Sequence, residues 1–312
     1  MQAFWMVLAS LMFAFMAISI KWASTTFTTF EIVFYRGLVS FILMYVVARS
    51  RGITLATRYP FMHLWRGTIG VVSLSAWFYA IAQLPVATAM TLNYMSGVWV
   101  AVFVIAGSLI AGSASKTQSL GPLFLTVLMG FVGVVLMLKP TLQADQIFAA
   151  FIGLFSGFGA GLAYMQVSAL GKIGEPEDRT VFYFGLCTLI AGLMGMVIDG
   201  MHQSALGNTT AHLIFLSYLQ HWHSPKAWAI IPIGAFATAG QWCMTRAYSQ
   251  GSTMVAASLQ YLGIVFSALL GIILLNESLD PLSWLGILII VSSGLIATVL
   301  RNKTISKPTT TP

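Results

Sequence analysis

Charged side chains are scarce in this sequence. Of its 312 residues, 15 are Lys or Arg and 8 are Asp or Glu, together 7% of the chain, whereas a soluble domain carries about 25%. A soluble chain of this length could not cover its surface with so few charges. The composition therefore excludes a soluble enzyme, a disordered chain and a soluble nucleic-acid-binding protein.

Cysteine and metal-ligand patterns are equally sparse. The two cysteines, Cys187 and Cys243, lie inside apolar runs, so they form neither a disulfide framework nor a CxxC metal site. Four of the five histidines fall in or beside residues 200–226, but no cysteine or carboxylate has ligand spacing to them. The sequence also lacks a Gly-rich phosphate loop that ends in Gly-Lys-Ser/Thr. We predict no metal, no cofactor and no ATP-driven pumping.

Apolar residues, in contrast, make up 58% of the chain. A helix needs about 20 apolar residues to cross a bilayer, and ten segments reach that length. They are residues 3–22, 29–48, 64–83, 87–110, 119–138, 147–168, 180–199, 227–247, 253–275 and 281–300. The sequence therefore predicts an all-α polytopic membrane protein with ten transmembrane helices.

The basic residues predict the orientation. With a cytoplasmic N-terminus, eleven of the 15 Lys and Arg residues, Arg66 among them, fall on the cytoplasmic side, and three fall on the opposite side. Arg36 lies inside the second segment. Because cytoplasmic loops are enriched in Lys and Arg, we expect both termini in the cytoplasm of a bacterial cell, beneath its inner membrane. The net charge of +7 is then expected to contact lipid headgroups and no nucleic acid.

The two halves of the chain resemble each other. Residues 92–95 (LNYM) align with 259–262 (LQYL), and 34–38 (FYRGL) align with 182–186 (FYFGL). Because each half has five segments, the second begins on the opposite side of the membrane. We therefore expect inverted repeats over 1–140 and 141–302, and a disordered tail over 303–312. Inverted repeats are common in secondary transporters, whose substrate site lies near the midplane between them.

These features resemble the EamA type of the drug/metabolite transporter superfamily. The resemblance covers roughly residues 3–300 and is carried by Arg36, the LNY pattern and LLGIILLNE at 269–277. It implies a central cavity lined mainly by helices 1, 3, 4, 6, 8 and 9, and substrates such as amino acids, nucleobases, vitamins or S-adenosylmethionine. Glu277 matches an acidic residue of the family pattern, and Ile110 departs from it. Gly97 and Gly263 stand near the points where members often carry proline.

Polar side chains in mid-span are the candidate substrate contacts, because they are costly in lipid unless they face protein or a wet cavity. Asn93 and Gln260 occupy equivalent repeat positions, so two amides are expected to face one cavity. The alternative is that each amide joins two helices by a hydrogen bond.

The remaining candidates are mainly aromatic. Rings in a cavity suit a flat or amphipathic solute, although lipid-facing packing is the alternative for each ring. Arg36 either binds an anionic group, snorkels or pairs with Glu31, and Arg246 is interpreted as a membrane anchor, with a cation–π contact to Trp242 as the alternative. The predicted substrate residues besides Asn93 and Gln260 are Tyr94, Tyr261, Trp77, Trp99, Tyr164, Gln241 and Arg36.

The sequence has no carboxylate in mid-membrane, where proton-coupled carriers usually keep one. We therefore expect facilitated diffusion or exchange of an amino acid or a similar zwitterionic or neutral metabolite, by a monomer or weak homodimer. The nearest alternative is a nucleobase, vitamin or S-adenosylmethionine carrier. An intramembrane serine hydrolase built on Ser156 is a weaker hypothesis, because no mid-span histidine is available as its base.

Overall fold

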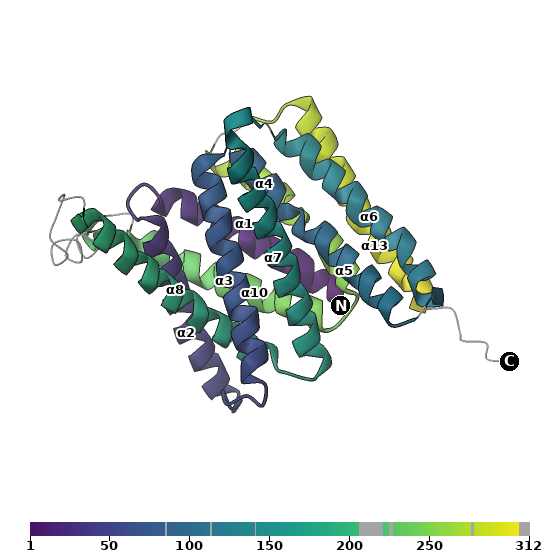
Figure 1. Cartoon of the computed structure of the whole chain (residues 1–312), viewed down its shortest axis with the longest axis horizontal. Helices are drawn as coiled ribbons and strands as arrows, with labels where there is room; N and C mark the ends of the chain where they lie inside the picture. The colour runs from purple at the N-terminus through teal and green to yellow at the C-terminus, as the bar shows by residue number, and fades with distance from the viewer. Residues whose placement is uncertain are drawn as a thin grey trace.

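The computed structural model describes residues 1–84, 86–112, 114–140, 142–205, 221–224, 227–275 and 278–305. Every regular element in these ranges is a helix (Figure 1). The α-helices are α1 (Gln2–Ala23), α2 (Thr29–Ser50), α3 (Pro60–Gln83), α4 (Val86–Tyr94), α5 (Ser96–Ile110), α6 (Ala114–Leu138), α7 (Ile147–Lys172), α8 (Glu177–Ala205), α10 (Ile230–Ser249), α11 (Thr253–Leu259), α12 (Leu262–Leu275) and α13 (Pro281–Ile305). Short 3-10 helices are η1 (Ala144–Gln146), η2 (His221–His223) and η3 (Ala227–Ala229).

Each predicted span coincides with one helix or with two consecutive helices. Among the described residues, eight spans are long and apolar enough to cross a membrane, and α3 and α10 coincide with the two other predicted spans. The prediction of an all-α polytopic membrane protein is thus confirmed. The start of α3 differs from the prediction: the helix begins at Pro60 instead of residue 64, because proline is favoured in the first turn of a helix.

The outside of the bundle is apolar, as lipid contact requires. Large aliphatic side chains such as Ile42, Val46, Ile198 and Leu288 are exposed. In a soluble protein, apolar patches of this extent would mark a binding surface or cause aggregation. Here they lie on helices of membrane-spanning length.

The fourth and ninth predicted spans are each broken in two. The first breaks at Met95, between α4 and α5, and the second at residues 260–261, between α11 and α12. Neither break contains proline. At the second break the Gly263 amide donates to the Gln260 carbonyl, three residues back, and this tighter turn redirects the helix. Gly97 allows the two breaks to approach, since a Cβ there would lie 2.8 Å from Cζ of Tyr261.

The helices pack in a regular pattern of pairs. α2 packs against α8, α6 against α13, α1 against α10 and α3 against α7. Figure 1 shows α6 and α13 side by side along one edge of the bundle, with α2 and α8 toward the other. We call one side of the bundle the N-terminal face. It is the side on which α1 begins and on which residues 51–59 lie.

Candidate functional site

A cavity of about 260 Å³ lies among α1, α2, α3, α4, α5, α7, α8, α10 and α12. Its walls are mostly apolar, with a few polar side chains that converge on one space, as is typical of small-molecule sites. Seven of the nine predicted substrate residues line it, namely Arg36, Trp77, Asn93, Tyr94, Tyr164, Gln241 and Gln260. The structure thus brings together side chains from both halves of the chain.

Trp99 and Tyr261 do not line the cavity. Trp99 stacks on Phe103 at 6.1 Å between ring centroids and meets Phe158 edge-on at 5.2 Å. Tyr261 is fully buried in the core, where a Cβ on Gly130 of α6 would lie 2.7 Å from its ring. Because the helix breaks beside Gln260, that residue faces the cavity while its neighbour Tyr261 turns toward α6.

The two amides expected at equivalent positions both face the cavity and both make hydrogen bonds between helices. Asn93 Nδ2 on α4 donates to Ser156 Oγ on α7 at 3.0 Å. Gln260 Oε1 accepts from the Tyr248 hydroxyl at 3.0 Å, and Gln260 Nε2 donates to Ser96 Oγ at 3.4 Å. Each amide therefore fixes the cavity wall and still contributes to its surface.

A stacked pair of aromatic rings lies at the cavity wall, which Tyr164 lines. Tyr164 on α7 stacks on Tyr248 of α10, with 5.3 Å between the ring centroids and 18° between their planes. Tyr248 is fully buried, and its hydroxyl donates to Gln260. This chain of contacts connects α7, α10 and the break after α11.

Arg66 is a cavity residue that the sequence reasoning missed. It was counted among the basic residues at the membrane edge, but its side chain lines the cavity and is only 2% exposed. The error follows from the start of α3: because the helix begins at Pro60, Arg66 already lies almost two turns inside it. Its guanidinium lies 3.6 Å from the centroid of the Phe184 ring.

The predicted alternative for Arg36, an ion pair with Glu31, does not form. The Glu31 carboxylate instead accepts from the Thr28 amide at 2.7 Å, which caps α2, and pairs with His221 Nδ1 at 2.9 Å. Arg36 lines the cavity. Gln241 also lines it, and its Nε2 is buried without a hydrogen-bond partner in the described part of the chain.

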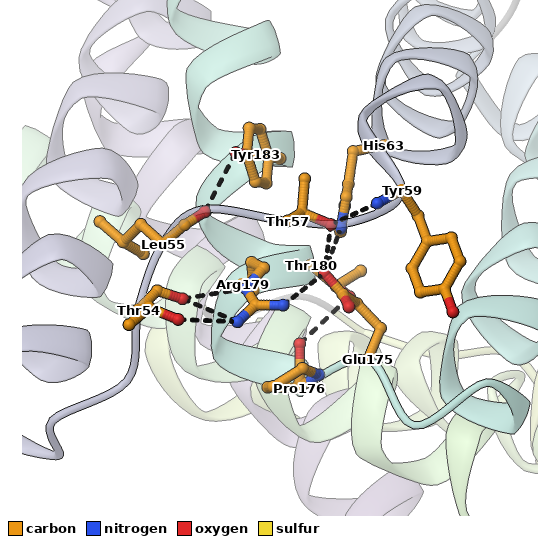
Figure 2. A network of polar contacts seen from close by, with 10 residues as sticks. All are labelled: Thr54, Leu55, Thr57, Tyr59, His63, Glu175, Pro176, Arg179, Thr180 and Tyr183. Atoms are coloured by element: carbon orange, nitrogen blue, oxygen red, sulfur yellow. Dashed lines mark hydrogen bonds and ion pairs between the residues drawn. The ribbon is translucent and has the colours of Figure 1, made fainter.

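A polar network lies at the N-terminal face (Figure 2). One oxygen of Glu175, Oε1, accepts from Thr57 at 2.7 Å and from Arg179 at 3.0 Å, and lies 2.8 Å from His63 Nε2. Arg179 also donates to the Thr54 carbonyl. The network ties the segment between α2 and α3 to the turn between α7 and α8.

Replacing Glu175 with glutamine should destabilise the protein in a pH-dependent way. Burial alone would raise the pKa of Glu175, but hydrogen bonds from His63, Thr57 and Arg179 outweigh it and lower the pKa. The stabilisation is therefore complete above the ordinary glutamate pKa and is lost as the pH falls through the lowered value. We expect Glu175→Gln to lose about 2 kcal/mol of unfolding free energy at pH 7, and less at pH 4.

Unfolding of the purified protein in detergent at the two pH values measures this effect. The matched control is Asp145→Asn, which changes an exposed carboxylate and should leave stability unchanged at both pH values. An equal loss for Glu175→Gln at pH 7 and pH 4 would contradict the assigned role of the charge.

A second cluster at this face involves Asp178, at the start of α8. Its carboxylate accepts from Trp242 Nε1 at 2.7 Å and pairs with Arg51 at 3.2 Å. The Arg246 guanidinium lies 5.2 Å from the Trp242 ring and 5.1 Å from the Trp5 ring. The cation–π alternative for Arg246 is thus confirmed, and these contacts join α1, α2, α8 and α10.

Two of the histidines that the structure describes pair with buried carboxylates. His63 meets Glu175 and His221 meets Glu31, and no group of three potential metal ligands occurs in the described part of the chain. Glu277 and residues 206–220, which include His212, lie outside the described residues. Ser156 is fully buried; its hydroxyl donates to the Gly153 carbonyl and accepts from Asn93.

Comparison with known proteins identifies the family. The model of the EamA-like transporter family matches residues 179–299. The pseudopaline exporter of Pseudomonas aeruginosa is 32% identical over 289 residues, which is 91% of each chain. The chain belongs to the EamA-like transporter family. The S-adenosylmethionine uptake transporter of Rickettsia bellii is also similar to this chain. The two are 22% identical over 92% of this chain and 89% of the Rickettsia protein.

The fold agrees with this assignment. A solved crystal structure superposes on 96% of the chain, and on 98% of its own length, with a TM-score of 0.73 at 14% identity. This EamA-family chain is a membrane transporter of small molecules and not an enzyme.

Proposed function

We propose that this protein is a secondary transporter that carries a small metabolite across the bacterial cytoplasmic membrane by alternating access. The observation that carries the proposal is the cavity, to which both halves of the chain contribute polar side chains. Its volume of about 260 Å³ suits a small metabolite. We propose that Arg36, Asn93, Gln241 and Gln260 contact the substrate, with Trp77, Tyr94 and Tyr164 packing against its apolar parts.

Inverted repeats over 1–140 and 141–302 are part of the proposal, and the helix packing supports them. A two-fold axis in the membrane plane would exchange α2 with α8 and α6 with α13, and these are the helices that pack on each other. It would also exchange the pair α1–α10 with the pair α7–α3, and both pairs are in contact.

The close contacts between α2 and α8 follow the same rule. Gly37 faces Leu189, and Gly185 faces Phe41. The sequence alignment of the two halves pairs Gly37 with Gly185 and Phe41 with Leu189, because both pairs are 148 positions apart. The two-fold axis would therefore convert the contact of Gly37 with Leu189 into the contact of Gly185 with Phe41, and both contacts are present.

We propose that the N-terminal face is cytoplasmic and that the Glu175 and Asp178 clusters close the cavity on that side. Rocking of one repeat against the other would separate α2 from the α7–α8 turn and α1 from α10, so these polar contacts would break and re-form in each cycle. Export is the favoured direction, because the relative that is 32% identical is named as an exporter.

We further propose facilitated diffusion or exchange. The cavity lining contains no Asp or Glu in the described part of the chain, and the buried carboxylates Glu31 and Glu175 are engaged in hydrogen bonds elsewhere. An amino acid or a similar metabolite with a carboxylate fits the cationic and amide donors better than a neutral nucleobase does.

Transport by the purified protein in proteoliposomes tests this mechanism. Comparing metabolites of a deletion strain and an overexpressing strain first supplies the substrate. Labelled substrate should then enter down its own gradient, and unlabelled substrate inside the vesicles should accelerate its entry. Accumulation driven by an imposed pH or Na⁺ gradient would overturn the uniport or exchange mechanism.

A further inference from the structure

Arg66 lines the cavity and has no counterion among the described residues. Its Nε and Nη1 atoms are buried and have no hydrogen-bond partner in the described part of the chain. The Phe184 ring, 3.6 Å away, covers one face of the guanidinium, but a ring does not replace the hydrogen bonds that the group loses on burial. An unpaired charge in a membrane protein is costly and usually functional. Packing alone therefore does not account for Arg66.

Arg36 brings a second positive charge to the same cavity. It lies on α2, lines the cavity with Arg66, and its charge repels that of Arg66. Glu31, the acidic residue on the same helix, is fully buried and held by Thr28 and His221. The two arginines thus share one cavity, and no carboxylate of the described residues lines it.

The other polar neighbours supply donors and neutral groups. Tyr164 and Cys187 are near enough to Arg66 to interact with its charge, but phenols and thiols are ordinarily neutral at pH 7. Gln241 Nε2 is a third buried donor without a partner among the described residues. α5 begins at Ser96 on the cavity wall, and the start of a helix carries partial positive charge. Among the described residues, the cavity lining therefore carries two positive charges and no carboxylate.

We propose that Arg36 and Arg66 form a subsite for two carboxylates of the transported metabolite, a deduction that rests on the proposed function. Guanidinium groups bind carboxylates through two parallel hydrogen bonds, so two arginines match a small organic dianion. The apolar side chains of Met6, Trp77 and Met90 line the same cavity and would contact the carbon skeleton.

Gly70 provides the space for the Arg66 side chain. A Cβ at Gly70 would lie 3.0 Å from Arg66 Nη1 and 3.0 Å from Phe184 Cε2. Gly70→Ala therefore displaces the guanidinium without removing its charge. This variant distinguishes a subsite with defined geometry from a general positive potential.

Binding to the purified protein in nanodiscs tests the subsite. The probes are succinate, acetate and inorganic phosphate, each compared with sodium chloride at equal ionic strength, and the readouts are Trp fluorescence and the unfolding midpoint. We expect succinate to bind most tightly. Arg66→Gln and Arg36→Gln should each weaken succinate binding at least about tenfold, since a hydrogen bond to a charged group is worth about 1.5–3 kcal/mol. Arg66→Lys and Gly70→Ala should weaken it by less.

Two comparisons separate this role from a structural one. Arg58→Gln removes an exposed arginine and should leave succinate binding unchanged. Arg66→Met should leave the ligand-free unfolding midpoint unchanged or raise it, because it removes an unpaired buried charge. A lowered midpoint together with intact succinate binding would overturn the subsite.

The remaining outcomes distinguish the subsite from the transport function. Tighter binding of phosphate than of succinate would overturn the dicarboxylate assignment. If no anion binds while proteoliposomes still carry a neutral metabolite, the subsite is wrong and the transporter stands. If succinate binds through both arginines but the substrate found in cells is not exchanged in proteoliposomes, the subsite stands and the proposed mechanism is wrong.

Discussion

Replacing Gly37 with valine should prevent the protein from forming a stable bundle. Gly37 lies where α2 crosses α8, and a Cβ at this position would lie 2.7 Å from Cα of Leu189 and 2.9 Å from the carbonyl carbon of Thr188. Both atoms belong to the α8 backbone, so no side-chain rotation relieves the clash. Overpacking of a core costs about 1–3 kcal/mol where side chains adjust, and we expect more here.

The measurement is the yield of monodisperse protein in detergent and its resistance to unfolding. Gly107→Val is the matched control, because Gly107 also lies in a membrane-spanning helix and a Cβ there would meet no atom within 4 Å. We expect the control to behave as wild type. A Gly37→Val protein with wild-type stability would show that α2 and α8 do not pack this closely.

The contact between α2 and α8 illustrates what a sequence can and cannot predict. The ten spans follow from hydropathy, because a bilayer forces each crossing segment to be long, apolar and helical. The alignment of the FYRGL and FYFGL segments placed Gly37 and Gly185 in equivalent positions. The close approach of Gly37 to Leu189 depends on how two distant helices cross, and hydropathy carries no information about crossing geometry.

The candidate site was predictable where symmetry fixed the direction of a side chain. Asn93 and Gln260 were paired from the repeat and both line the cavity. Tyr94 and Tyr261 were paired in the same way, yet only Tyr94 lines it, because the break after Leu259 changes the direction of the next residues. A local break of this kind, without proline, leaves no clear signal in composition.

Other features require tertiary contacts between distant segments. Two hydrogen-bond partners of Glu175, namely Thr57 and His63, lie more than 100 positions earlier in the chain. Arg66 was missed for a simpler reason: a four-residue error in the predicted start of α3 placed this cavity residue among the basic residues on the cytoplasmic side. Errors in helix boundaries therefore matter most for charged residues, whose role changes with depth.

Replacing Asn93 with alanine should lower transport about tenfold while leaving the fold intact. The Asn93 amide contributes to the cavity surface, and the loss of one hydrogen bond to a substrate is worth about 1.4 kcal/mol, or tenfold. The fold loses little, because Ser156 keeps its own bond to the Gly153 carbonyl at 2.8 Å. Initial rates of exchange in proteoliposomes, per folded protein, measure the effect.

Gln260→Ala should reduce transport at least as strongly and also reduce stability, because it leaves the buried Tyr248 hydroxyl without its acceptor, at a cost of about 1–3 kcal/mol. Gln83→Ala, which changes an exposed amide at the end of α3, should do neither. If Asn93 and Gln260 are coupled through the same substrate, their effects will not be additive in the double variant. Additive losses would mean that the two amides act independently, and wild-type transport by both single variants would remove the amides from the binding site.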